Sequence, residues 1–240
     1  KNSKLLSFEH KLKQGMISKG YTPEFADRLF NQIKGFGGYG FPESHSASFA
    51  LLAYVSAWLK CHHPAAFYVG LLNSQPMGFY SPSQLVQDAQ RHHILILPTD
   101  VNHSDWDHQL LSSDNTRQPP IRLGLRLVKG LSQAAGKRIS DVRRQRAFTN
   151  LADLRRRASL DRKNMEALAA ADALSSISGH RHQTHWQTMA LEDHQPLLPE
   201  EASLQHKIRP EVRLPTPSLG EEVLADYQST GLSLKAHPLA

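Results

Sequence analysis

Residues 128–139 read VKGLSQAAGKRI, a pattern in which a glycine precedes a run of helix-forming residues. Gly130 permits a tight turn in a backbone conformation that other residues resist. After this turn, Ser132 can cap a helix whose first backbone N–H groups have no intrahelical partner. Ala135 and Ile139 recur at helical spacing and predict a buried face. The spacing is that of a helix-hairpin-helix element, in which two short helices are joined by a tight turn.

The start of the predicted helix is a place for an anion, because open N–H groups and the helix dipole both favour negative charge. Basic residues before and after the turn add positive charge beside it. Contacts of this kind hold a nucleic-acid backbone without reading the bases, so we expect DNA binding that is independent of sequence and sensitive to salt. The residues that we assign to DNA binding are Lys129, Gly130, Leu131, Ser132, Lys137, Arg138, Arg143 and Arg144.

A purely structural role for the hairpin stays open as an alternative. Ser132 stands where such hairpins usually carry a second glycine, although a serine can still cap the helix. A more degenerate copy of the pattern spans residues 160–174, and its apolar spacing favours core packing over DNA contact. Further basic residues follow in clusters at 143–146, 155–157 and 162–163. Neighbours on a helix lie about 100° apart, so only some of these side chains can share one face.

Upstream of the hairpin the apolar positions predict helices. Residues 5–34 form two helical blocks broken at 20–23, and the second block should end before the glycine-rich turn at 35–42. A buried helix rich in alanine, leucine and aromatic residues is expected from Ser46 to His62. Further helices are expected over 65–73 and from about 81 to 92.

Two short strands are expected on either side of a polar loop, at residues 94–98 and 121–125. Downstream, helices are expected over 132–146, 150–158 and 162–173, and one helix and one strand over 221–234. Proline, glutamate and serine increase between 191 and 220, which is typical of a linker. The expected fold class is therefore mainly α, with a few short β-strands.

Composition restricts the function only loosely. The 28 Lys and Arg residues outnumber 22 Asp and Glu residues, a modest preference for polyanionic partners. The single cysteine, Cys61, lies in an apolar pattern, where we expect it to pack, and it can form no intramolecular disulfide. With no secretion signal and no apolar run of about 20 residues, we expect a cytoplasmic protein. The first residue is not Met and the last residues form no clear element, so we expect a fragment.

No catalytic constellation is visible in the sequence, and we assign neither catalytic nor metal-binding residues. His180, His182 and His185 have loose metal-ligand spacing, but no cysteine pair accompanies them and histidine is frequent throughout the chain, with 14 residues. A stand-alone metal-dependent enzyme is accordingly the weakest of the functional hypotheses.

Two other stretches resemble a known family. Residues 34–50, KGFGGYGFPESHSASFA, and residues 58–67, WLKCHHPAAF, are similar to the fingers of bacterial C-family DNA polymerases, which are polymerase III alpha-like. The FPESH sequence at 41–45, together with residues 72–82, resembles the error-prone, ImuC-type branch. The resemblance continues through 97–102 and 122–131 to the C-terminal end, and it is weakest over 191–220.

This resemblance implies a domain order. Residues 1–93 would be the C-terminal part of the fingers, 94–120 a connecting segment, 121–190 a tandem helix-hairpin-helix domain, 191–220 a linker and 221–240 the start of a C-terminal segment. The catalytic palm of the family lies upstream of these regions, so this chain is expected to be inactive alone. It needs no cofactor of its own, whereas Mg²⁺ and dNTP are implied for the intact polymerase. By position, His45 is the candidate for a contact with the nucleotide triphosphate.

The resemblance also implies partners. DNA, as duplex or primer-template, is the first, and a sliding clamp is the second. Gln195, Leu197 and Leu198 lie where alpha-type enzymes carry a clamp-binding peptide, although the usual final aromatic residue is missing. ImuA/ImuB-type accessory proteins are the third. They support an alternative function, in which the chain is a scaffold for such proteins and has little affinity for DNA.

Overall fold

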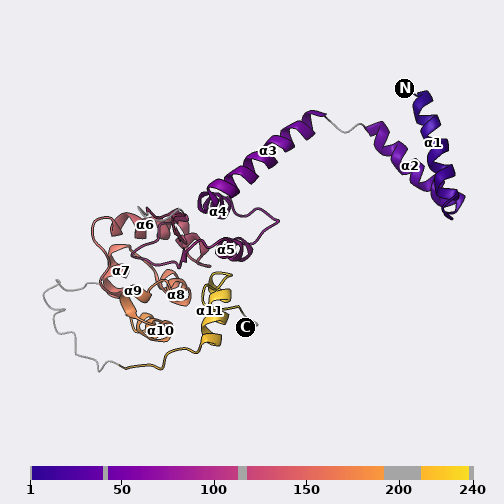
Figure 1. Ribbon diagram of the computed structural model, residues 1–240. Coiled ribbons are helices and arrows are strands. Elements are labelled where there is room, and N and C mark those ends of the chain that lie inside the picture. The colour runs from indigo at the N-terminus through magenta and orange to yellow at the C-terminus, as the bar shows by residue number, and fades with distance from the viewer. Residues whose placement is uncertain (1, 40–42, 113–117, 192–211, 238–240) are drawn as a thin grey trace. The chain divides into compact units, whose positions relative to one another are not determined.

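The computed structural model describes residues 2–39, 43–112, 118–191 and 212–237. The chain divides into two compact units, Lys1–Ala57 and Trp58–Ala240. Figure 1 shows a chain built mostly of helices, with one small sheet. The mainly α fold class with a few short strands is therefore confirmed.

The first unit contains a pair of packed helices, α1 (Asn2–Ile17) and α2 (Pro23–Tyr39). Ala26 and Phe30 of α2 are buried, and Lys13 of α1 makes an ion pair of 2.7 Å with Asp27. The expected end of the second helix before Gly35 is wrong, because α2 continues to Tyr39. Glycine weakens a helix by about 1 kcal/mol without forbidding it, whereas a proline stops it.

The long helix α3 (Glu43–His62) begins in the first unit and ends in the second. The expectation that it is buried is wrong within this chain. Leu51, Leu52 and Tyr54 keep 65%, 59% and 70% of their surface exposed. Cys61 is also exposed and unpaired, so it does not pack as expected. The helix α3 carries apolar side chains of its own on all faces. Such a helix is buried only where a partner surface is present to cover it.

In the second unit, α4 (Pro64–Asn73) and α5 (Pro82–Arg91) pack on a three-stranded sheet. Its strands are β1 (Ile96–Leu97), β2 (Gln109–Leu110) and β3 (Ile121–Arg122), in the order β1-β3-β2. β1 is parallel to β3, and β2 is antiparallel to it. The sequence predicted β1 and β3 but not β2, which lies in the loop read as polar.

The second core of this unit belongs to the hairpins. It is formed by the 3-10 turn η1 (Leu125–Leu127) and the helices α6 (Gln133–Arg143), α7 (Leu151–Arg157) and α8 (Arg162–Ala170). Ile139, Leu154 and Leu168 are fully buried there. The three helices expected in this region are therefore present, with ends a few residues shorter than predicted.

Three further helices complete the second unit. The short α9 (Ser175–Ser178) and α10 (Arg181–Met189) were not expected, because their sequences lack an apolar periodicity. The last helix, α11 (Leu219–Ser229), was expected, but the strand after it is absent from the described residues 230–237. α10 and α11 both pack on α8.

Candidate nucleic-acid interface

The turn before α6 has the geometry that the sequence predicted. Gly130 has φ +87°, the left-handed conformation that favours glycine. Leu131 is buried beneath the turn, and Ser132 caps the helix by accepting a hydrogen bond of 3.2 Å from the amide of Ala135. The first intrahelical bond is donated by Gly136 to the carbonyl of Ser132.

The start of α6 therefore leaves backbone donors open. The amides of Gln133 and Ala134 precede the first intrahelical bond, and the described part of the chain offers them no acceptor. Both residues are exposed. Open amides at the positive end of a helix dipole form a binding site for a phosphate oxygen.

The second hairpin, between α7 and α8, repeats this backbone geometry with different chemistry. Ser159 takes the place of the glycine with φ +49°, and Leu160 is buried as Leu131 is. The N-cap of α8 is Asp161, whose carboxylate accepts a bond of 2.7 Å from the amide of Asn164. A carboxylate at this position already occupies the anion site, so the second hairpin is less suited to phosphate.

Asn164 joins the two hairpins. Its side-chain oxygen accepts a bond of 3.4 Å from the amide of Ser132, and its side-chain nitrogen donates to Asp161 over 2.6 Å. Only 8% of Asn164 is exposed. This link ties the starts of α6 and α8 together, and no sequence pattern predicts it.

Four of the five basic residues assigned to DNA divide into two groups, and the fifth, Lys129, donates to the carbonyls of Tyr227 and Gln228. Arg138 donates to the carbonyls of Ala158 and Ser159 at the end of α7, and Arg143 donates to the carbonyls of Val101 and Ser104. Arg143 is also paired with the carboxylate of Asp105. These contacts hold the domain together and use part of the donors of each guanidinium, and DNA contact by these two arginines stays a prediction.

Lys137 and Arg144 form the second group: Lys137 is exposed on α6, and Arg144 is exposed at the C-cap that follows it. Lys137 has no hydrogen-bond or ion-pair partner among the described residues, and it lies one turn after the open amides of Gln133 and Ala134. Arg144 pairs with Asp141 across 3.1 Å in solvent, a contact that phosphate can readily replace. In the first hairpin these two side chains are exposed cations that bond no backbone carbonyl among the described residues.

Several arginines of the later clusters are used inside the fold. The carboxylate of Asp153 pairs with Arg146 at 3.0 Å and with Arg157 at 3.1 Å, and it accepts a bond from the amide of Thr149. Burial raises the pKa of Asp153, but the bonds from Arg157 and Thr149 outweigh it, so the pKa is held below its usual value. The guanidinium of Arg157 also lies over the ring of Phe148.

Comparison with known proteins shows what the chain is similar to. A model described as "Helix-hairpin-helix motif" matches residues 93–184. The error-prone DNA polymerase of Saccharophagus degradans is 54% identical over 243 residues, which is 100% of this chain and 23% of that protein. The chain is related over its whole length to a segment of error-prone DNA polymerases. The resemblance drawn from residues 34–50 and 58–67 is thereby confirmed.

Other error-prone DNA polymerases are similar to the chain to the same degree. That of Teredinibacter turnerae is 54% identical over 240 residues, covering 100% of this chain and 23% of the relative. That of Methylococcus capsulatus is 52% identical over 250 residues, covering 97% of this chain and 24% of the relative. The chain thus spans about a quarter of the length of the curated polymerases that it matches.

Two further sets of predicted site residues are less defined. His45 lies on α3, with its ring 4.3 Å from that of Phe49. The clamp-binding candidates Gln195, Leu197 and Leu198 lie outside the described residues. Both stay predictions.

No group of three or more His, Cys, Asp or Glu side chains within the described ranges could hold a metal ion. His180 caps α10 instead, and His182 contacts the carbonyl of Pro215 over 3.0 Å. Within the described residues, none of the helices combines the length and apolar character needed to cross a bilayer.

Proposed function

We propose that this segment of an error-prone DNA polymerase holds duplex or primer-template DNA by its phosphate backbone, through the first hairpin. The observation that carries the proposal is the pair of open amides at Gln133 and Ala134, with Lys137 one helical turn away. A phosphate oxygen would accept from the amides while the ammonium of Lys137 neutralises its charge. Arg144, at the other end of α6, would reach a second phosphate.

The segment would serve the whole polymerase in translesion synthesis during DNA repair, in the cytoplasm. In that polymerase the catalytic palm, upstream of this segment, would hold Mg²⁺, His45 would contact the triphosphate of dNTP from the fingers, and Gln195, Leu197 and Leu198 would engage a sliding clamp. The support for these roles is the similarity to error-prone DNA polymerases along the whole chain. Phosphate contacts ignore sequence, a property that suits a polymerase moving along its template.

The test is fluorescence anisotropy with primer-template DNA over a salt series. Gly130→Asp combined with Lys137→Ala places a carboxylate at the turn and removes the accessible ammonium. We expect wild-type affinity to fall steeply with salt, and the double variant to lose about tenfold or more at low salt. Lys137→Ala alone should flatten the slope of log affinity against log salt by about 1.

Lys19→Asp is the matched control, because it makes the same change of two charges at an exposed turn of the first unit. It should reduce affinity much less than the hairpin variant. Equal losses in both variants, or equal binding by wild type and the hairpin variant, would contradict the proposal. A complex with accessory proteins that forms without DNA affinity would favour the scaffold function instead.

A further inference from the structure

The first hairpin is bonded to α11, about 100 residues further along the sequence. The amide of Lys129 donates to the carbonyl of Ser229 over 2.9 Å. Its ammonium donates to the carbonyls of Tyr227 and Gln228, at 3.0 and 2.9 Å, across 98 and 99 residues of sequence. All three carbonyls lie in the last turn of α11, where a helix dipole attracts positive charge. The residue before Gly130 is therefore fixed through both its backbone and its side chain.

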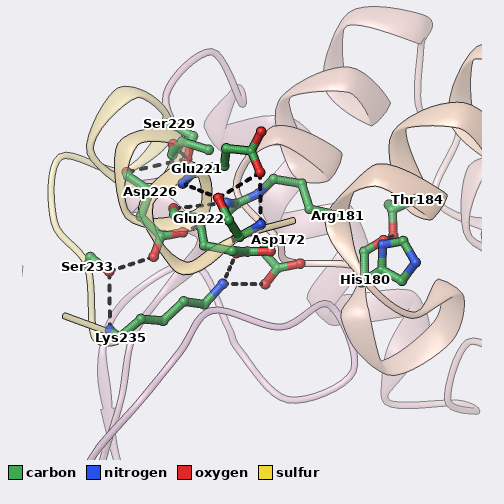
Figure 2. A network of polar contacts seen from close by, with 12 residues as sticks. Asp172, His180, Arg181, Thr184, Glu221, Glu222, Asp226, Ser229, Ser233 and Lys235 are labelled. Carbon is green, nitrogen blue, oxygen red and sulfur yellow. Dashed lines mark hydrogen bonds and ion pairs between the residues drawn. The ribbon is translucent and has the colours of Figure 1, made fainter. Parts of the chain in front are cut away.

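A network of buried charges holds α11 in this place (Figure 2). Arg181 of α10 donates to the carbonyl and carboxylate of Glu222, both at 3.0 Å, and is paired with the carboxylate of Asp226. Its side chain is only 8% exposed. The other oxygen of Asp226 accepts from the hydroxyl of Ser233 over 2.7 Å.

A second cation extends the network. Lys235 pairs with Asp172 at 3.1 Å and with Glu222, so the chain after α11 is tied back to the end of α8 (Figure 2). Val223 of α11 and Leu232 beyond it are buried. Charged side chains buried in this way specify one arrangement, because breaking a single partner leaves the other charge uncompensated.

We propose that Arg181 and Asp226 are positioning residues for the first hairpin, which fix α11 so that its last carbonyls orient Lys129 and the turn at Gly130. The proposal rests on DNA binding by that hairpin. Two of the three ammonium protons of Lys129 are bonded to carbonyls of α11. The role of Lys129 in this proposal is therefore to orient the turn and not to bind phosphate. A fixed turn presents the amides of Gln133 and Ala134 without an ordering cost on binding.

Asp226→Asn tests the proposal in the full chain, because it keeps the shape but removes the negative charge and puts an amide NH₂ in place of one of the two oxygens to which Arg181 and Ser233 donate. Glu221→Gln is the matched control: it removes the same charge from the same helix, and glutamine can keep the capping box with Ser218. Ser233→Ala is a milder second variant, should Asp226→Asn fail to fold. Amide hydrogen exchange and DNA anisotropy are measured on each.

We expect Asp226→Asn to speed exchange of the Lys129 amide about tenfold and to weaken DNA binding about fivefold. Ser233→Ala should give smaller changes in the same direction, and Glu221→Gln should give neither. The Leu160 amide, which donates to Arg155 in the second hairpin, should keep its protection in all variants. This contrast separates positioning from a general loss of stability.

Three results would overturn the proposal: unchanged exchange at Lys129, equally accelerated exchange at Leu160, or DNA affinity that rises when α11 is loosened. If the wild-type chain does not bind DNA at all, the proposed function fails and the positioning of a DNA site fails with it. The exchange data then still decide, separately, whether α11 holds the turn.

Discussion

Single charged residues in this domain act mainly on the fold itself. Arg138 and Arg143 donate to backbone carbonyls at loops and helix ends, where a sequence reading counts them as free positive charge. Such bonds satisfy carbonyl groups that helices and loops leave open. The positive charge available to a polyanion is therefore smaller than the composition suggests, although Lys137 and Arg144 of the first hairpin are exposed and bond no backbone carbonyl among the described residues.

Asp172 gives a stability prediction with a definite pH dependence. Burial raises the pKa of its carboxyl group, and the charge of Lys235 lowers it without outweighing burial. One carboxylate oxygen is buried without a hydrogen-bond partner among the described atoms. A carboxyl group whose folded pKa lies above the unfolded value of 3.8 loses stability as pH rises through the folded pKa.

Asp172→Asn should accordingly raise the Tm at pH 7, and its advantage should shrink as pH falls toward 3.8.

Asp153→Asn is the opposite case, because the pKa of Asp153 is lowered in the folded protein. It should lower the Tm at pH 7, with the loss fading in acid. Thermal unfolding followed by circular dichroism from pH 3.5 to 7.5 checks both signs. A lower Tm for Asp172→Asn at pH 7 would show that its pair with Lys235 dominates.

At the scale of elements, the two hairpins share a backbone path that the sequence shows only once. Gly130 marks the first turn plainly, whereas Ser159 at φ +49° hides the second, because serine gives no sign of a left-handed conformation. The second hairpin was expected only as a packing element. The carboxylate of Asp161, which caps α8 by accepting from the amide of Asn164, agrees with that expectation.

A pair of substitutions should have unequal effects. Gly130→Ala should lower the free energy of unfolding by about 1–2 kcal/mol, because alanine is strained at φ +87°. Steric contact is not the reason, since the new methyl carbon would meet Ala167 at an ordinary 3.7 Å. Ser159→Gly should change the same quantity by less than about 0.5 kcal/mol, as relieved strain offsets the added freedom of the unfolded chain. Urea denaturation measures both, and equal losses would contradict this account.

Helices with an apolar face and a recognisable start were predictable, and α6, α7 and α8 are present where expected. α10 was not, because its sequence RHQTHWQTM buries Arg181, Thr184 and Thr188 in place of an apolar stripe. The open amides of the first hairpin follow from local sequence alone. The link through Asn164 and the contacts of Lys129 with α11 do not, since they join residues 32 and about 100 positions apart.

At the scale of the whole molecule, the two units differ in how much apolar surface they bury. Among the described side chains, the first unit buries the hydrophobic residues Ala26 and Phe30, whereas the second has two extended cores. Local stability follows such burial. The similarity to error-prone DNA polymerases covers both units.

Amides in α2 should therefore exchange much faster than those in α6 and α8, by about 100-fold or more under native conditions. Hydrogen exchange with mass spectrometry on the full chain resolves these helices. Addition of DNA should slow exchange at the start of α6 and leave α2 unchanged. Equal protection of α2 and α8 without DNA would contradict this prediction, because the stability of α2 would then exceed what its buried side chains provide.

The exposed Cys61 on α3 has a consequence for handling the protein. It is the sole thiol in 240 residues, so air oxidation can join molecules two at a time and never into longer chains. A maleimide dye or a spin label would likewise attach at Cys61 alone, without substitution of other cysteines. Every molecule in a sample would then carry its reporter at the same point, three residues from where the second unit begins at Trp58.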